Sequence, residues 1–196
     1  IVLMALAGGQ LLLGVAPLES SNLFIIAATL IVLAAIPICV TRIEQPAQIP
    51  VATFSPLLVF RTSRVAAFGA IASGIIASVY YALGPAYGLQ AGMEIEAISF
   101  MMALGIVGGA LALLPLGRLS DRVDRRVVIA GAMLTGAVVA LVTWLAPLAV
   151  VPAMMFLFGA CVMPIQALCL AHASDNIGNQ SFLEVGTGLL VMNASG

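Results

Sequence analysis

Charged side chains are scarce in this sequence, and many of them gather in one short stretch, residues 117–129, called here the charged turn. Its six charged residues are Arg118, Asp121, Arg122, Asp124, Arg125 and Arg126. A carboxylate such as Asp121 can accept hydrogen bonds from the backbone at a helix N-terminus, and guanidinium groups can pair with carboxylates on adjacent helix ends. We therefore expect this stretch to be a tight turn that Gly117 opens by ending a helix. The plainer alternative is a charged anchor with no further role.

The other candidates are polar residues that lie in or beside apolar stretches. Asp175 is a candidate partner of Arg125 or Arg126, and Glu184 is a second candidate for this cluster, for carrying a proton, or for a solvated helix end. His172, one helical turn before Asp175, is either a structural histidine or a proton relay. The residues that can line a central cavity, or form hydrogen bonds between helices, are Tyr80, Tyr81, Gln166 and Asn193.

No set of residues in the sequence converges on catalysis or metal binding. His172 and Asp175 are the only close pair of ligand type, and they lack a third ligand. The cysteines stand in apolar runs without a C-x-x-C spacing, so we expect them to be buried, free and hydrophobic in behaviour. The sequence therefore predicts no enzyme, no metal site and no cofactor.

The composition points to a protein that lipid surrounds. Hydrophobic residues make up 63% of the chain, charged residues only 8%, and the mean hydropathy is +1.21. Ordinary soluble domains carry about 25% charged residues. A net charge of −1 gives no electrostatic basis for binding nucleic acid.

Charge-free runs divide the chain into seven predicted membrane helices, since a span needs roughly 20 apolar residues. The run 127–174 is long enough for two helices, and Pro147 and Pro152 place a turn between them. The predicted spans are residues 1–18, 20–41, 65–93, 97–117, the two halves of 127–174, and a last one from Val185 onward. We expect the first and last spans to be incomplete and the chain to be truncated at both ends.

The arginines define the orientation of these spans. If the spans alternate, all seven arginines fall on one side, while Glu19, Glu94 and Glu96 fall on the other. The positive-inside rule makes the arginine side cytoplasmic. Residues 42–63 read as a cytoplasmic linker in which Pro56 begins a short surface helix, or as a plain loop.

Rows of small residues predict where helices approach closely, because lipid gives no hydrophobic drive for their association. Gly105 and Gly109 form a G-x-x-x-G in the fourth span, although chance accounts for such spacing in a sequence rich in Ala and Gly. Similar rows run in the third and fifth spans, at Ala70, Gly74 and Ser78 and at Ala132, Gly136 and Ala140.

The charged turn resembles the signature loop of the Major Facilitator Superfamily, G-x-L-[AGS]-D-[RK]-x-G-R-[RK]-x-x-[LIV]. The matching residues are Gly117, Leu119, Ser120, Asp121, Arg122, Arg125, Arg126 and Ile129. Asp124 departs from the family's glycine, which suits a left-handed turn, and Asp is among the residues that tolerate that conformation. The departure leaves the geometry of the loop open.

A closer similarity is to the YcaD-like branch of bacterial transporters. It rests on four stretches that together cover nearly the whole chain: 9–12 (GQLL), 80–87 (YYALGPAY), 115–121 (PLGRLSD) and 158–175. The resemblance implies a helical bundle that holds about seven of the family's twelve helices, those numbered five to eleven. Residues 1–41 then end the N-terminal half, 42–63 form the central linker, and 64–196 form a C-terminal half that lacks its last helix.

The resemblance also implies a function. A transporter of this kind moves a small molecule by alternating access in a bacterial inner membrane, with proton coupling as one option. Its charged turn is expected to hold the inward-closed state, and its partners are the lipid bilayer and the missing helices of its own chain. A scaffold or sensor without flux is the alternative, and an intramembrane enzyme is the weakest one.

Overall fold

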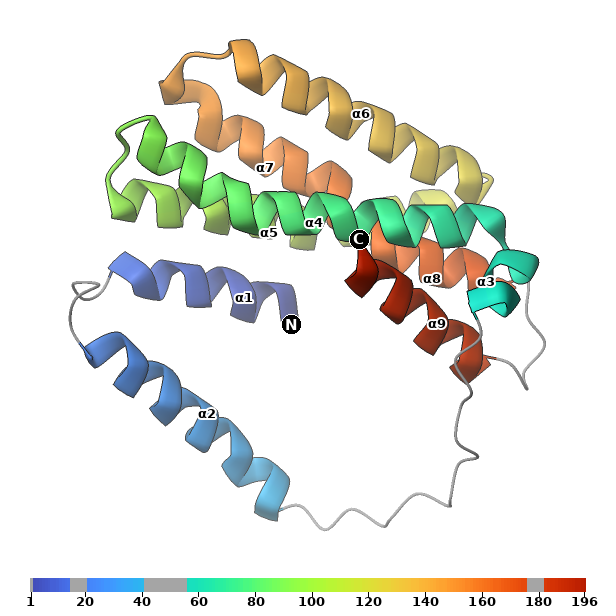
Figure 1. Ribbon diagram of the computed structural model, residues 1–196, viewed down its shortest axis with the longest axis horizontal. Helices are drawn as coiled ribbons and strands as arrows, with labels where there is room; N and C mark the ends of the chain where they lie inside the picture. Colours follow the sequence, from blue (N-terminus) through green and yellow to red (C-terminus); the bar gives the residue numbers. More distant parts are fainter. Residues whose placement is uncertain (1, 15–20, 41–55, 176–181) are drawn as a thin grey trace.

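The structure is a computed structural model that describes residues 2–14, 21–40, 56–175 and 182–196. Throughout these ranges the regular elements are helices, which confirms the predicted all-α class. The elements are α1 (Val2–Leu11), η1 (Leu12–Gly14), α2 (Asn22–Val40), α3 (Pro56–Thr62), α4 (Arg64–Gln90), α5 (Ile95–Ser120), α6 (Arg125–Leu145), η2 (Leu148–Val150), α7 (Val151–Val162), α8 (Ile165–Asp175) and α9 (Phe182–Ser195). Figure 1 shows most of them as a bundle of long, roughly aligned helices.

Long apolar helices occur where the hydropathy pattern predicted membrane spans. α4, α5, α6 and the continuous segment Leu148–Asp175 are each long and apolar enough to cross a bilayer. Shorter apolar helices lie at Val2–Gly14 and Asn22–Pro37, and α9 follows at the C-terminal side. The predicted turn between Pro147 and Pro152 is present as the short η2 helix.

One break in this pattern was not predicted. The segment Leu148–Asp175 is interrupted at Met163 and Pro164, where α7 ends and α8 begins. Proline has no N–H to continue the helical ladder, and its ring crowds the preceding turn. Pro85 and Pro115 lie inside α4 and α5 without ending them, so the presence of a proline alone does not identify the break.

The region before α4 contains a short helix, as expected, and it begins at Pro56. A cap that the sequence reasoning missed follows it: the Ser63 hydroxyl accepts a hydrogen bond of 3.2 Å from the backbone N–H of Ala66 and starts α4. The preceding part of the predicted linker, residues 42–55, lies outside the described residues.

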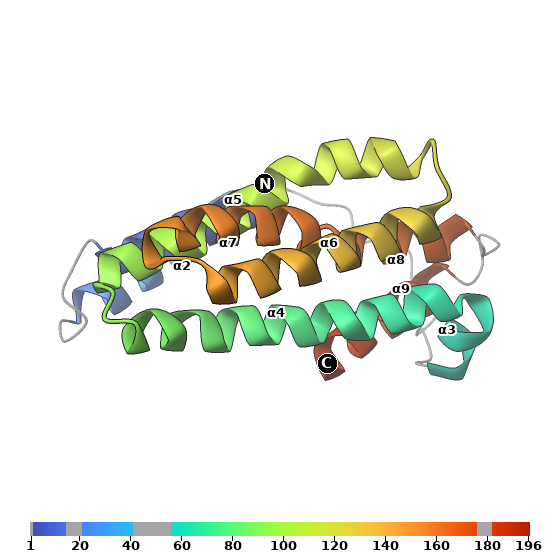
Figure 2. The same ribbon diagram turned by 90° about the horizontal axis from the view of Figure 1, so that it is seen from above.

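The bundle has two chemically different ends. Figures 1 and 2 show α3, the charged turn, the last turn of α8 and the first turn of α9 at one end, with the α4–α5 and α6–α7 connections at the other. The first, called here the arginine end, carries Arg61, Arg64, Arg118, Arg122, Arg125 and Arg126. The second carries Glu94 and Glu96. Arg42 and Glu19 lie outside the described residues.

Glycines allow the closest helix contacts, chiefly where α5 crosses α7. A Cβ on Gly159 of α7 would meet the carbonyl oxygen of Gly105 on α5, and one on Gly108 would meet the carbonyl oxygen of Phe156. The predicted contact through Gly105 and Gly109 is therefore present. Of the other two rows, Gly74 and Gly136 are buried at helix contacts, while Ser78 and Ala140 are exposed.

The first two helices are packed less than the rest. α1 lies along α5 and buries Ala7 there. No side chain described in α2 is buried, and Phe24 is 77% exposed. Large exposed hydrocarbon side chains suit contact with lipid or with further apolar helices.

Candidate functional site

The charged turn is built on the last turn of α5. That helix continues to Ser120, so the expectation that Gly117 ends it is wrong by three residues. The Gly117 carbonyl stays in the helical ladder and accepts from the N–H of Asp121 at 3.1 Å, and the Ser120 hydroxyl donates to it at 2.8 Å. The backbone bond from Asp121 keeps this carbonyl in the helix, and the Ser120 bond is a local side-chain bond to the same turn.

Asp124 lies at the end of the turn, directly before α6. Its φ and ψ angles are −52° and 120°, and its carboxylate accepts a hydrogen bond of 2.9 Å from the N–H of Arg126. It is therefore the N-cap of α6 and does not adopt the left-handed conformation suggested by the family's glycine. The negative charge also lies favourably at the N-terminus of α6. The sequence analysis offered that kind of role to Asp121.

Arg125 is the central side chain of the site. Its Nη2 donates to Asp121 Oδ1 at 3.0 Å, and its Nε lies 2.6 Å from Asp175 Oδ2 at the end of α8. The Arg125 side chain is 21% exposed, whereas Asp121 and Asp175 are 65% and 52% exposed. One guanidinium thus joins the turn to a different helix, and it is Arg125 rather than Arg126 that meets Asp175.

The remaining arginines of the turn are exposed to solvent. Arg118 and Arg122 form no ion pair with a carboxylate in the described part of the chain, and Arg126 is exposed as well. Leu119, which the signature also includes, is 47% exposed. The turn therefore divides its positive charge between one paired residue and several that face outward.

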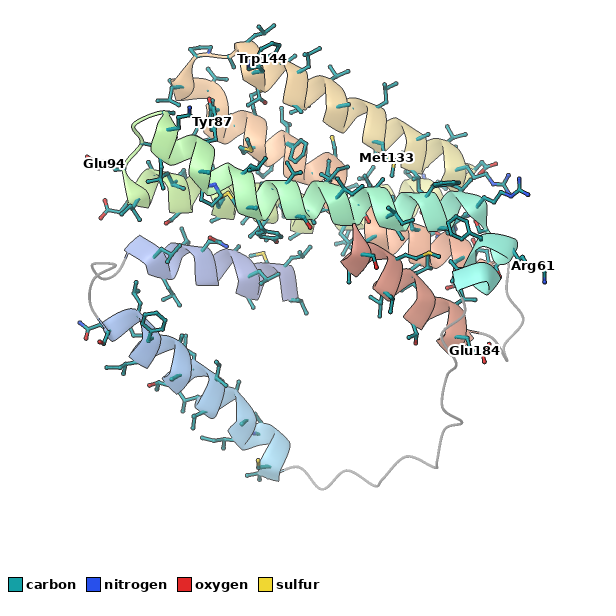
Figure 3. The ribbon with its side chains drawn as sticks, in the orientation of Figure 1. Arg61, Tyr87, Glu94, Met133, Trp144 and Glu184 are labelled. Carbon is teal, nitrogen blue, oxygen red and sulfur yellow. The ribbon has the colours of Figure 1, made fainter. Side chains whose placement is uncertain are left out.

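An open polar cleft of about 580 Å³ lies where the turn meets α8. His172 lines it together with Asp175, Arg125 and Asp124, and the imidazole is only 6% exposed. The structure thus brings His172 into the same cleft as the ion pair. Glu184 lies apart from that cleft, half-buried in the first turn of α9. Figure 3 labels it at the same end of the bundle as Arg61.

The four predicted cavity residues do not form one cluster. The Tyr80 hydroxyl donates to the Met102 carbonyl at 2.5 Å, which ties α4 to α5, and its ring stacks on Phe158 of α7. Tyr81 packs edge-on against Tyr80 and is 39% exposed. Gln166 is exposed on α8.

Asn193 links two helices. Its amide donates to the Ala70 carbonyl at 3.1 Å and to the Ser73 hydroxyl at 2.9 Å, and so ties α9 to α4. The backbone of α9 also lies against Gly74. Asn193 and Tyr80 therefore have the interhelical role that the sequence analysis gave as the alternative to cavity lining.

An aromatic pocket near the other end was missed. It measures about 220 Å³, lies between α4, α6 and α7, and is lined by Tyr80, Tyr87, Phe158 and Thr143 among others. The sequence gave no periodic signal for it, because its walls come from three helices. Within the described residues no group of three His, Cys, Asp or Glu side chains could hold a metal ion.

Comparison with known proteins gives the family. The sequence model described as Major Facilitator Superfamily matches residues 1–194. An uncharacterized MFS-type transporter of Enterobacter sp. (strain 638) is 27% identical over 93% of this chain and 48% of its own length. The uncharacterized MFS-type transporters YcaD of Escherichia fergusonii and of Salmonella paratyphi B are 26% and 28% identical. They are matched over 93% and 80% of this chain and over 48% and 41% of their own lengths.

The chain thus spans about half the length of the curated relatives it matches. No solved structure matches it significantly. The family match covers nearly all of the sequence, and the apolar helices suit a bilayer. This chain is therefore an integral membrane protein that belongs to the Major Facilitator Superfamily.

Proposed function

We propose that this chain is part of a secondary active transporter that moves a small molecule across the membrane by alternating access. Family membership and relatives named as transporters support transport over intramembrane catalysis. In this proposal residues 1–41 end the N-terminal half, 42–63 are the central linker, and 64–196 belong to the C-terminal half. The arginine end faces the cytoplasm of a bacterial inner membrane.

The observation that carries the mechanism is the double pairing of Arg125. A guanidinium that holds Asp121 in the turn and Asp175 on α8 fixes the relative position of two helix ends at one face of the membrane. We propose that this latch forms in the inward-closed state and opens when the helix ends separate. Gly117, Leu119, Arg122 and Arg126 shape the same turn, and Glu184 on α9 is a second acidic group at this end.

His172 and Glu184 are the proposed carriers of a coupling proton, because ionisable residues inside or at the edge of the membrane are commonly functional. Tyr81 and Gln166, which are exposed on α4 and α8, are the proposed cavity residues.

The test of transport begins with a growth and efflux screen of a deletion strain, followed by flux of the compound so found in proteoliposomes of the full-length protein. Substrate-dependent flux supports the proposal. A substrate that binds without flux in correctly folded protein would instead make it a scaffold or sensor.

Orientation is tested separately, with single cysteines. A cysteine that replaces Val123 in the turn should react with an impermeant maleimide in inverted vesicles but not in intact cells. A cysteine that replaces Ala91, which is exposed between α4 and α5, should show the reverse pattern. Labelling of the turn from outside intact cells contradicts the proposed orientation.

A further inference from the structure

A groove between α5 and α6 starts at the charged turn, and of the residues that line the His172 cleft it shares Val123 alone. It measures about 360 Å³. Leu119 and Val123 line it on one side, Val127 and Gly131 of α6 on the other, and Cys161 of α7 at its floor. It therefore begins at the arginine end and extends along α6 toward the middle of the bundle.

The groove opens away from the protein interior. α5 and α6 both pack against α7, and Cys161 of α7 lines the groove between them. Val127 in its wall is 61% exposed, and a Cβ added to Gly131 would meet no atom within 4 Å. The hydroxyl of Thr135 in the same wall donates to the Gly131 carbonyl of its own helix. The walls thus present hydrocarbon to whatever lies outside, at the depth of a bilayer.

Two arginines neighbour the groove in the chain, at its end nearest the charged turn. Arg118 and Arg122 directly precede the lining residues Leu119 and Val123 in the chain, and both are exposed. Unlike Arg125, neither forms an ion pair with any carboxylate that the structure describes. Arginines with long apolar stems beside a hydrocarbon groove can place their charged ends at the level of lipid headgroups.

We propose that this groove binds one phospholipid with an anionic headgroup. An acyl chain occupies the groove between α5 and α6, and the phosphate pairs with Arg118 and Arg122 at its mouth. Basic pockets between membrane helices are a known kind of site for anionic headgroups. The apolar walls select a lipid over a soluble phosphate, and the uncompensated charge selects an anionic lipid over a zwitterionic one. The site goes beyond the proposed transport activity and can be tested without a transport substrate.

The experiment measures lipid binding to the purified full-length protein by native mass spectrometry. The probes are a phosphatidylglycerol, the phosphatidylcholine with the same acyl chains, and glycerol 3-phosphate as the soluble headgroup. Gly131→Leu adds a side chain in the groove at a position where a Cβ meets nothing within 4 Å, and Gly9→Leu is its matched control, because a Cβ on Gly9 of α1 also meets nothing within 4 Å. Arg118→Gln removes one charge from the mouth.

The wild-type protein and Gly9→Leu should retain one phosphatidylglycerol, which glycerol 3-phosphate does not displace, while Gly131→Leu should bind it at least about tenfold more weakly. Arg118→Gln should weaken the binding of phosphatidylglycerol about fivefold, which is the typical contribution of one arginine near an anionic headgroup. It should leave the binding of phosphatidylcholine unchanged.

Four results would overturn the proposal. Equal retention by Gly131→Leu and the wild type would mean only nonspecific lipid contact. Equal binding of phosphatidylglycerol and phosphatidylcholine would show that the site does not select an anionic headgroup. Displacement by glycerol 3-phosphate would show that it does not require acyl chains. A lipid-free Gly131→Leu protein that unfolds at a much lower temperature than Gly9→Leu would mean that another segment of the full-length chain fills the groove.

Discussion

Replacing Arg125 with alanine is the sharpest perturbation of the charged turn. Only one of its two ion pairs joins separate elements, the one to Asp175 at 2.6 Å, because the pair to Asp121 spans four residues of the same turn. Exposed pairs contribute about 0.2–1 kcal/mol, and the low exposure of Arg125, at 21%, favours the upper end. Loss of about 1 kcal/mol changes an equilibrium about fivefold.

If the pair forms only in the inward-closed state, Arg125→Ala should favour opening at the arginine end. The assay places a single cysteine at Gln166, a proposed cavity residue, in the full-length protein. The rate of maleimide labelling in inverted vesicles should rise about fivefold in Arg125→Ala. Arg61→Ala is the control, because it removes an exposed arginine from the same end without breaking either ion pair of the turn. Asp175→Ala should have the same effect as Arg125→Ala.

The double variant decides the interpretation. If Arg125 and Asp175 act through one another, the variant with both alanines should label no faster than either single variant, since the pair can be lost only once. Labelling rates within twofold of the wild type in Arg125→Ala, at normal expression, would refute the latch. Strictly multiplicative effects of the two substitutions would show that the residues act separately.

The other predictions concern what holds the bundle together, and each is read from the thermal midpoint of the full-length protein in detergent. Gly159→Ala should destabilise strongly, by about 2 kcal/mol or more, because its methyl group meets the Gly105 carbonyl of α5. Gly131→Ala, with open space around it, should be neutral or stabilising, and an equal loss in both would contradict the packing. Asp124→Ala should cost about 1 kcal/mol by removing the cap of α6, and an unchanged midpoint would show that the cap is dispensable. Asn193→Ala should cost about 0.6–1.7 kcal/mol through its lost bonds to α4, and no change would mean that these bonds are replaced.

Much of the helix layout follows from charge and proline alone. In a chain with so few charges, each cluster of charged residues must mark a helix end, because a charge at bilayer depth is costly. Pro147 and Pro152 are separated by four apolar residues. They could be recognised as a turn because the charge-free run 127–174 is too long for one membrane helix. Pro164 could not, because Pro85 and Pro115 show that a single proline is compatible with an unbroken helix here.

The sequence predicted which residues form the site, but it did not predict which of them form ion pairs with one another. Sequence spacing allowed Asp175 to meet either Arg125 or Arg126, and only the orientation of α6 against α8 decides for Arg125. The role of Asp124 was missed because the comparison with a glycine in the family pattern drew attention to the left-handed conformation. An aspartate just before a helical run is also an N-cap signal, and that signal agrees with the structure.

The arginines of the charged turn differ in their surroundings, and this difference reconciles two interpretations of the sequence. Arg125 is the least exposed residue of its two ion pairs, and both of its partners are carboxylates of this chain. Arg118 and Arg122 stand free of carboxylates in the described chain, next to an apolar groove, so their charge remains available to the membrane surface. A positive-inside anchor and a latch were opposing interpretations of the sequence. They are compatible once the charges are assigned residue by residue, because anchoring requires unpaired arginines and latching requires a paired one.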